Sequence, residues 1–231
     1  MRIKILGDSD QSRGKAFELL MVSILSHLGY TDFKINVRPA AMELDIEATH
    51  KTNNNRILCE CKAHKEPIST DDVRLFHSNL NYEIDKTYVD KGLFFSISGF
   101  TSNVDRWYKD SGENTKRTLS LNGIEQIVQL LHESTLLTSD ETLDRIVKNN
   151  TSYQLGERYL VAYQSDIFVV QLLVQEGKIT SYMILSGMGN IVPVTITHEI
   201  SKLDYELADY SLLDPIITKK VTLNLLDLKS L

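Results

Sequence analysis

Apolar residues in the first 132 positions of this 231-residue chain alternate between helical spacing and strand spacing. A helix is predicted over 11–28, because apolar residues recur there every three or four positions, and Gly29 is well placed to end it. The residues of this apolar stripe are Phe17, Leu20, Met21, Ile24 and Leu28. Three short strands are predicted to follow, and a turn at 52–55 joins the last two into a hairpin. These strands cover 32–37, 43–49 and 56–62.

The same alternation continues to about residue 132. A polar run at 69–72 is typical of a helix cap, and the apolar spacing after it predicts a helix. The stretch 91–98 is the most apolar strand candidate, and we expect it in the interior of the sheet. A helix around 103–109, a strand near 117–121 and a further helix beginning at 122–125 complete the pattern. Helices that alternate with strands in this way predict an α/β fold, a mixed sheet flanked by helices.

Beyond residue 137 the pattern changes. The stretch 138–154 is polar and weakly helical, which makes it the best candidate for a linker. The apolar residues that follow predict a small antiparallel meander with turn signals between its strands. Its strands are 159–163, 167–174, 179–185 and 191–196, with 221–228 as a further candidate. We therefore expect a first domain over 1–137 and a small β-rich domain over 155–231, whose sequence carries no motif that indicates its function.

Composition narrows the classes of protein. An apolar share of 42% with 24% charged residues is ordinary for a globular protein, and no apolar run is long enough to cross a membrane. Cys59 and Cys61 are too close in sequence to form a disulfide framework, which indicates a reducing, cytoplasmic compartment. The net charge of −6 argues against a general electrostatic grip on nucleic acid. This charge is uneven: positions 1–132 hold 17 Lys/Arg and 18 Asp/Glu, net −1, whereas the remainder is net −5.

The strand predicted over 56–62 carries the most suggestive chemistry. Glu60 and Lys62 are two residues apart and face the same way, while the intervening cysteine faces the other. If the neighbouring strand lies beside it, Asp45 and Glu60 converge with Lys62 next to them. Two carboxylates and a lysine suit a divalent metal ion and an activated water. The plainer alternatives are a surface ion pair between Glu60 and Lys62, and a solvated strand face for Asp45.

Other residues near this strand also have two interpretations. Glu18, at the edge of the first helix's apolar stripe, is either a solvated flank residue or reaches into the same pocket as Asp45. His64 and Lys65 follow the strand and either contact a phosphate or form plain loop surface. Trp107 and Tyr108 either stack on a base or lie at the edge of the core. Both cysteines are expected to be small core residues, because no His partner set has zinc spacing.

Several short motifs follow one another along the chain in an order that resembles the catalytic domain of Mrr-like restriction endonucleases, which belong to the PD-(D/E)xK nuclease superfamily. The motifs are the helix with Glu18, Leu28-Gly29-Tyr30, the strand with Asp45, Glu60-Cys61-Lys62, Gly92-Leu93-Phe94-Phe95, and Ser98-Gly99-Phe100-Thr101. The resemblance covers about residues 11–132. Two features depart from the family pattern: Glu60 stands where many members carry glutamine, and Met42-Glu43 replaces a glycine pair.

The resemblance implies a metal-dependent endonuclease that hydrolyses DNA phosphodiester bonds, as a restriction or anti-phage defence effector. Asp45, Glu60 and the Cys61 carbonyl would hold Mg²⁺, with Mn²⁺ as an alternative ion. Lys62 would orient or activate the attacking water, and Glu18 would support the metal site. The competing hypothesis is a catalytically inactive module, on the same fold, that binds nucleic acid or protein. A protein partner or regulator acting through residues 155–231, and a homo-oligomer, are further expectations; a membrane partner is not expected.

Overall fold

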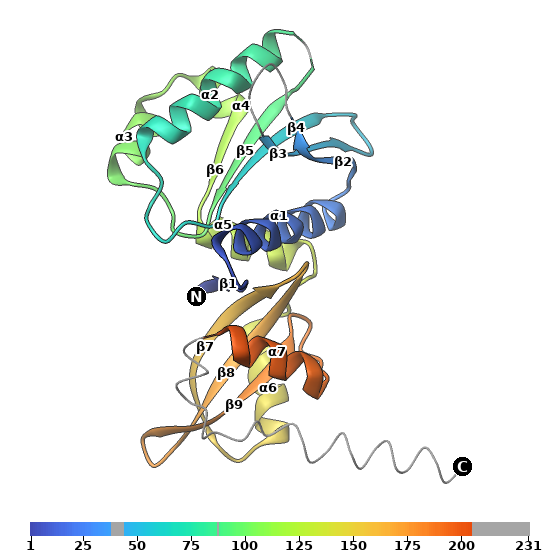
Figure 1. The fold of residues 1–231 in the computed structure, drawn as a ribbon, viewed down its shortest axis with the longest axis vertical. Coiled ribbons are helices and arrows are strands. Elements are labelled where there is room, and N and C mark those ends of the chain that lie inside the picture. Colours follow the sequence, from blue (N-terminus) through green and yellow to red (C-terminus); the bar gives the residue numbers. More distant parts are fainter. Residues whose placement is uncertain (38–43, 87, 205–231) are drawn as a thin grey trace, which may run out of the picture.

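The computed structural model describes residues 1–37, 44–86 and 88–204, which form two β-sheets and seven helices (Figure 1). The strands are β1 (Ile3–Ile5), β2 (Tyr30–Val37), β3 (Leu44–His50), β4 (Arg56–Lys62), β5 (Lys91–Ser96), β6 (Leu119–Asn122), β7 (Gln154–Tyr163), β8 (Asp166–Gln175) and β9 (Lys178–Ser186). The helices are α1 (Asp10–His27), α2 (Thr70–Asp85), α3 (Ser102–Asp110), α4 (Glu113–Thr118), α5 (Ile124–Glu133), α6 (Asp140–Asn150) and α7 (Val194–Leu203).

The first sheet has the strand order β2-β3-β4-β5-β6. β3 is antiparallel to both of its neighbours, β2 and β4, whereas β5 is parallel to both β4 and β6, so the predicted mixed sheet is confirmed. Apolar residues of α1 and α5 pack on one face, and those of α2 and α3 pack on the other. The strand predicted over 91–98 forms β5, an interior strand next to the central β4.

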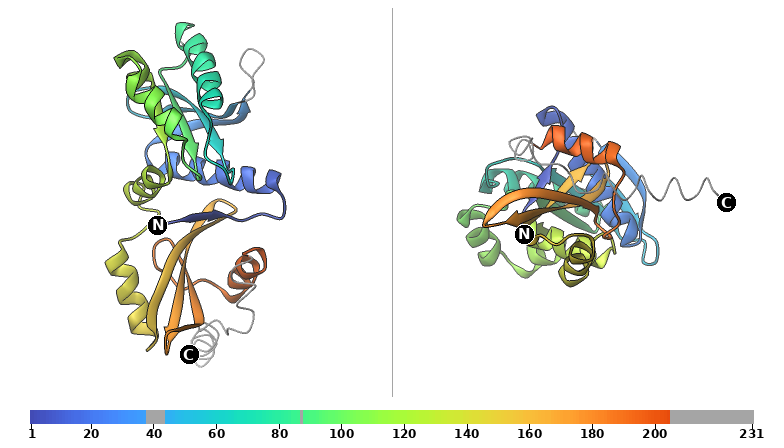
Figure 2. Two further views of the ribbon diagram at one scale, coloured as in Figure 1. Left: turned by 90° about the vertical axis from the view of Figure 1, so that its left-hand side faces the viewer. Right: turned by 90° about the horizontal axis from the view of Figure 1, so that it is seen from below.

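Helix α1 lies between the two sheets (Figures 1 and 2). Ser9 begins it with a capping box, in which Ser9 and Ser12 each accept a hydrogen bond from the other's backbone N–H. Gly29, directly after the cap residue Leu28, has φ +98°, a conformation that glycine adopts without the strain of a side chain. The buried residues of α1 share one apolar cluster with both sheets. They are Ala16, Phe17, Leu20, Met21, Ile24 and Leu25.

The second sheet has the order β1-β7-β8-β9, with β7, β8 and β9 forming the predicted meander. Alternate residues of its strands face opposite sides, as the period of a strand requires. One side, with Leu160 and Val169, packs against α1 and α6, and the other, with Val161 and Val170, packs against α7. Figure 2 shows α6 and α7 on opposite faces of this sheet.

Strand β1 was not predicted, and it connects the two parts of the chain. It pairs in parallel with β7, with Lys4 opposite Val161. The segment predicted as a linker, 138–154, contains α6, whose Leu143 and Val147 are fully buried. The division of the chain into 1–137, 138–154 and 155–231 stays a prediction. Among the described residues, β1 comes from the predicted first domain but is a strand of the second sheet, whose other strands lie in and next to the predicted last domain.

Two predicted strands need correction. The stretch 191–196 is not a strand: Ile191 makes a single bridge to Leu185, and α7 begins at Val194. Pro193 caps this helix, and a proline has no N–H to give to a strand ladder. The strand predicted near 117–121 is shorter at its start, because α4 runs to Thr118. The further candidate at 221–228 lies outside the described residues. No described helix is long and apolar enough to span a membrane.

Candidate active site at the ends of β3 and β4

The antiparallel pairing of β3 and β4 brings Asp45 close to Glu60. Ile46 pairs with Cys59, which sets Asp45 and Glu60 at the adjoining ends of the two strands, where the charge of Glu60 acts on Asp45. Lys62 lies on the same side of β4 as Glu60, because it is two residues further along the strand. Cys59 faces the other way and is fully buried in the apolar cluster that includes α1. The structure thus brings Asp45, Glu60 and Lys62 together.

The hydrogen bonds of these three residues are incomplete. Asp45 Oδ2 accepts a 2.6 Å hydrogen bond from the Cys61 backbone N–H, which holds its carboxylate at the end of β4. Glu60 Oε1 forms an ion pair with Lys62 Nζ. Glu60 Oε2 is buried and has no hydrogen-bond partner among the described residues. An unpartnered buried carboxylate oxygen is costly, so Glu60 is placed for a ligand that supplies a positive charge or a donor.

Burial and neighbouring charges perturb the pKa of both acids. Burial, with the neighbouring Glu60 charge, raises the pKa of Asp45 from 3.8 to about 7, although the Cys61 N–H and Lys62 oppose the shift. Burial also raises the pKa of Glu60, against the hydrogen bond and charge of Lys62. Burial lowers the pKa of Lys62, but the hydrogen bond and charge of Glu60 outweigh it and leave that pKa raised. Lys62 therefore stays protonated at neutral pH.

Two further acids act on this site from helices. Glu18 on α1 has a side chain that is 14% exposed and accepts a 3.2 Å hydrogen bond from Lys15. Its charge contributes to the raised pKa of both Asp45 and Glu60, so it lies near them and is not simply a solvated flank residue. Asp72 in the first turn of α2 acts on Glu60 and Lys62 in the same manner. Sequence reasoning missed Asp72, because the run 69–72 was interpreted only as a helix cap.

The chain that follows β4 is held in place and leads into a hollow. The Ile97 N–H donates to the Lys62 carbonyl at 3.3 Å, and Ser98 Oγ donates to the Glu66 carbonyl at 2.7 Å. His64 and Lys65 are exposed and line a hollow of about 570 Å³ that begins at Cys61 and Lys62. The opposite wall includes Arg13 of α1, a residue that sequence reasoning did not single out.

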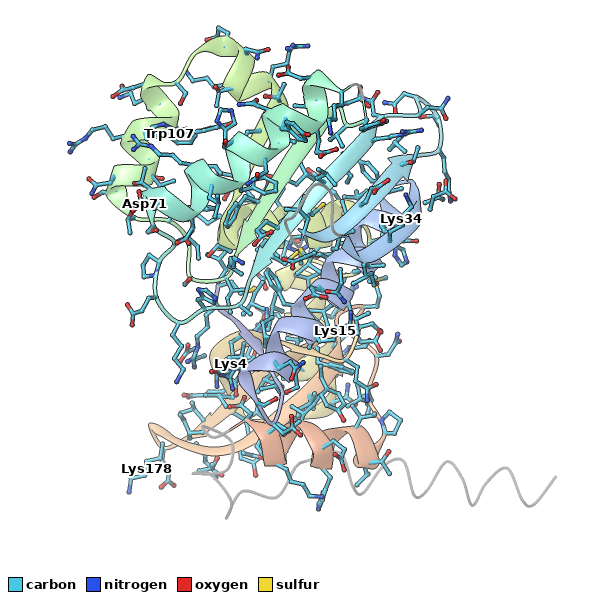
Figure 3. The ribbon with its side chains drawn as sticks, turned by 45° about the horizontal axis from the view of Figure 1, so that its top comes forward. Lys4, Lys15, Lys34, Asp71, Trp107 and Lys178 are labelled. Atoms are coloured by element: carbon cyan, nitrogen blue, oxygen red, sulfur yellow. The ribbon has the colours of Figure 1, made fainter. Side chains whose placement is uncertain are left out.

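The two cysteines are buried core residues, as predicted, and Trp107 and Tyr108 pack at the edge of the core. Cys59 and Cys61 are buried and free, and burial raises the pKa of each thiol. Tyr108 Oη donates to the Leu119 carbonyl at 2.7 Å, and Trp107 packs edge-on against the His77 ring at the margin of the core. Trp107 lies on the α2–α3 side of the molecule, away from Lys15 on α1 (Figure 3).

The residues present fit a divalent metal ion that takes few protein ligands. Among the described residues, no group of three or more His, Cys, Asp or Glu side chains is placed to hold a metal. Asp45 and Glu60 supply two carboxylates, and the Cys61 carbonyl is the candidate third oxygen. Mg²⁺ is commonly held by one or two carboxylates together with water and substrate phosphate. The unpartnered Oε2 of Glu60 is the observation that supports this fit.

Comparisons with known proteins were made for the whole chain. A family model described as a restriction endonuclease, Mrr_cat, matches residues 9–138. No curated protein matches. Among solved structures, a protein of unknown function is 20% identical with a TM-score of 0.37, over 58% of this chain and 77% of that one. The EndoMS complex with double-stranded DNA is 14% identical with a TM-score of 0.36, over 48% and 45% of the two chains. A repair endonuclease from Pyrococcus abyssi is 11% identical with a TM-score of 0.36, over 46% of each chain.

Proposed function

This chain belongs to the Mrr_cat family of restriction endonucleases, and we propose from that premise that it hydrolyses DNA phosphodiester bonds with the help of a divalent metal ion. The observation that carries the proposal is the meeting of Asp45, Glu60 and Lys62 at the ends of two adjacent strands, with one buried carboxylate oxygen unpartnered. Structural ion pairs normally satisfy such an oxygen. The same arrangement on a surface would not raise the pKa of Asp45 to about 7.

In this proposal Asp45, Glu60 and the Cys61 carbonyl hold Mg²⁺, or Mn²⁺ in its place. The bound ion would stabilise the charge that grows on the phosphoryl oxygens and lower the pKa of the attacking water. Asp45 is fixed for this task by the Cys61 N–H, and Glu60 by its ion pair with Lys62. Glu18 adds negative charge from α1 and would hold a water at the margin of the site.

Lys62 acts as a hydrogen-bond donor. The neighbouring carboxylates keep its amine protonated at neutral pH, so it does not take a proton from water in this state. Its Nζ would orient the water or a phosphoryl oxygen and offset phosphate charge. His64 and Lys65, on the exposed segment that follows, would contact the DNA backbone next to the scissile phosphate. Mg²⁺ at the acidic pair would add positive charge beside the phosphate, which would help a chain of net charge −6 to bind a polyanion.

The wider setting is part of the proposal. We propose that the enzyme acts in the cytoplasm as a restriction or anti-phage defence effector. We also propose that residues 155–231 bind a protein partner or regulator. A homo-oligomer is compatible with cleavage of both DNA strands.

A cleavage assay tests the function. Purified full-length protein is incubated with plasmid and single-stranded DNA in Mg²⁺, in Mn²⁺ or in chelator, beside the variant Lys62→Ala. We expect cleavage that needs the metal ion and that is lost in Lys62→Ala at an almost unchanged melting temperature. Wild-type cleavage that persists in Lys62→Ala would overturn the role of Lys62. DNA binding without cleavage in every metal would favour the inactive interaction module.

A further inference from the structure

A second hollow of about 420 Å³ lies between the two sheets, next to the candidate active site. It is lined by β1 and the end of α7 on one side, and by the segments that follow β4 and β5 on the other. Arg13, Ala63, His64 and Lys65 line both this hollow and the one that begins at Lys62. The two hollows therefore adjoin along a shared rim, which we call the basic rim after Arg13, His64 and Lys65.

The basic rim has cationic groups that a ligand can reach. His64 and Lys65 are exposed and have no hydrogen-bond or ion-pair partner among the described residues. Arg13 pairs with Asp10, whose side chain is 94% exposed, so water competes strongly for that ion pair. Lys4 also lines the hollow, on β1 below α1 (Figure 3), but it donates to Asp204 at 2.8 Å. Arg13 and Lys65 are thus the cations best placed for an anion.

Beyond the basic rim the walls are largely apolar, with Ser98 and the Lys4–Asp204 pair among them. Ile5 and Leu6 come from the N-terminal segment, Ile97 from the end of β5 and Leu203 from α7. An anion alone does not need such walls. A flat aromatic group attached to the anion would bury its faces against them, as ligands do in pockets of this size.

We propose that this hollow binds a nucleotide, with its phosphate at the basic rim and its base against Ile97 and Leu203. The class of ligand follows from the pairing of an apolar wall with cations, one short segment away from Lys62. The Ile97 N–H donates a hydrogen bond to the Lys62 carbonyl, so the apolar wall at Ile97 directly adjoins the end of the catalytic strand. The nucleotide is either a neighbour of the scissile phosphate in the substrate strand or a free nucleotide. The substrate source rests on the proposed function, whereas binding itself does not.

Isothermal titration of the full chain in chelator measures binding without cleavage. The probes are 5′-dAMP, a short single-stranded oligodeoxynucleotide and inorganic phosphate. Arg13→Ala removes a rim cation, and Leu203→Trp fills the apolar end. Arg145→Ala, an exposed arginine on α6 outside the hollow, is the matched control. Melting curves confirm that each variant is folded.

We expect at least one nucleotide probe to bind, with a loss of about tenfold or more in Arg13→Ala and in Leu203→Trp, and no loss in Arg145→Ala. Binding of 5′-dAMP supports a free nucleotide, and binding of the oligonucleotide alone supports the substrate strand. Nucleotide binding with the same affinity in Arg13→Ala and Leu203→Trp as in the wild type, or phosphate binding as tight as 5′-dAMP binding, overturns the proposal. The Lys62→Ala variant should still bind the nucleotide probe. If this variant binds the nucleotide and the wild type cleaves no DNA, the proposed function fails and the nucleotide site stands.

Discussion

A buried acid lies within the first sheet and another lies beside the second, and the two acids differ in how many of their oxygens have hydrogen-bond partners. Asp204, beside the second sheet, is 2% exposed and accepts 2.8 Å hydrogen bonds from Tyr159 Oη and Lys4 Nζ, one on each oxygen. Glu60, in the first sheet, is 8% exposed and has one oxygen bonded and the other unpartnered. Both are held at the margin of an apolar core, so burial alone does not separate them.

The difference separates structure from function. A buried charge with a complete set of partners stabilises one arrangement of the chain, and removal of a partner leaves a costly charge behind. A buried acid with a free oxygen, next to a second acid of raised pKa, costs stability in the absence of a ligand. The first sheet therefore has repelling, partly unpartnered carboxylates at one end, at Asp45 and Glu60. Beside the second sheet, by contrast, both oxygens of Asp204 have hydrogen-bond partners.

The largest expected effect is on cleavage. Glu60→Ala removes both side-chain oxygens that would hold the metal ion, and we expect cleavage to fall by about a thousandfold or more. Plasmid cleavage under single-turnover conditions measures this change. Glu47→Ala is the matched control, because Glu47 lies on the adjacent strand and pairs with Lys34 at 2.9 Å. Equal losses in the two variants would contradict a special role for Glu60.

The next effect is on folding, at the second sheet. Asp204→Ala leaves Lys4 and the Tyr159 hydroxyl without their buried acceptor, so the free energy of unfolding should fall by about 3–5 kcal/mol. Urea unfolding followed by circular dichroism gives this value. In the same assay with chelator, Glu60→Gln should be as stable as the wild type or more stable. A loss in Glu60→Gln that matches the loss in Asp204→Ala would remove the distinction between the two acids.

A smaller effect is the pH dependence of stability without metal. The folded-state pKa of Asp45, about 7, lies above its ordinary value of 3.8, so the folded protein binds the proton more tightly. The free energy of unfolding should then fall as the pH rises from about 4 to about 7, by on the order of 2–4 kcal/mol, and level off above that range. Asp45→Asn should flatten this fall in a series of urea titrations. A fall that persists unchanged in Asp45→Asn would assign it to other groups.

The smallest effect is expected at the surface pair of Lys34 and Glu47, on the same strands as the active site. The lysine side chain is 66% exposed, and water screens such a pair. Lys34→Ala should change the free energy of unfolding by about 1 kcal/mol or less, at any metal concentration. A larger change would mean that charges along β2 and β3 couple to the acidic site.

The sequence was sufficient to predict the meeting of Asp45, Glu60 and Lys62. A short polar turn between two strand patterns predicts a hairpin, and the two-residue period then determines which side chains share a face. The same local signals predicted α1, α2 and β5 to within a few residues. The site residues missed by sequence reasoning lie on helices. Arg13 and Asp72 reach the site through the way α1 and α2 pack on the sheet, and no local spacing encodes that.

Long-range pairing explains the other failures. β1 spans three residues, too few for any periodicity, and its partner β7 lies far along the chain. The apolar stripe of α1 was predicted as a single face, but Ala16 and Leu25 widen it because α1 is covered from two sides. Which surface covers a helix depends on residues distant in sequence, so the pattern of the helix alone does not reveal it.

The pairing of β1 with β7 has a consequence for synthesis. Lys4 leaves the ribosome 157 residues before its partner Val161, which at 5–20 residues per second is a delay of roughly 8–30 s. During that interval α1 can settle on the first sheet, while its other side, which β7 and β8 later cover, stays open to water and to other nascent chains. We expect ribosome-stalled chains that end before Gln154 to be cut by protease at α1, and chains that extend past Leu203 to be protected there. Equal protection of α1 at both chain lengths would show that α1 becomes protease-resistant before the second sheet forms.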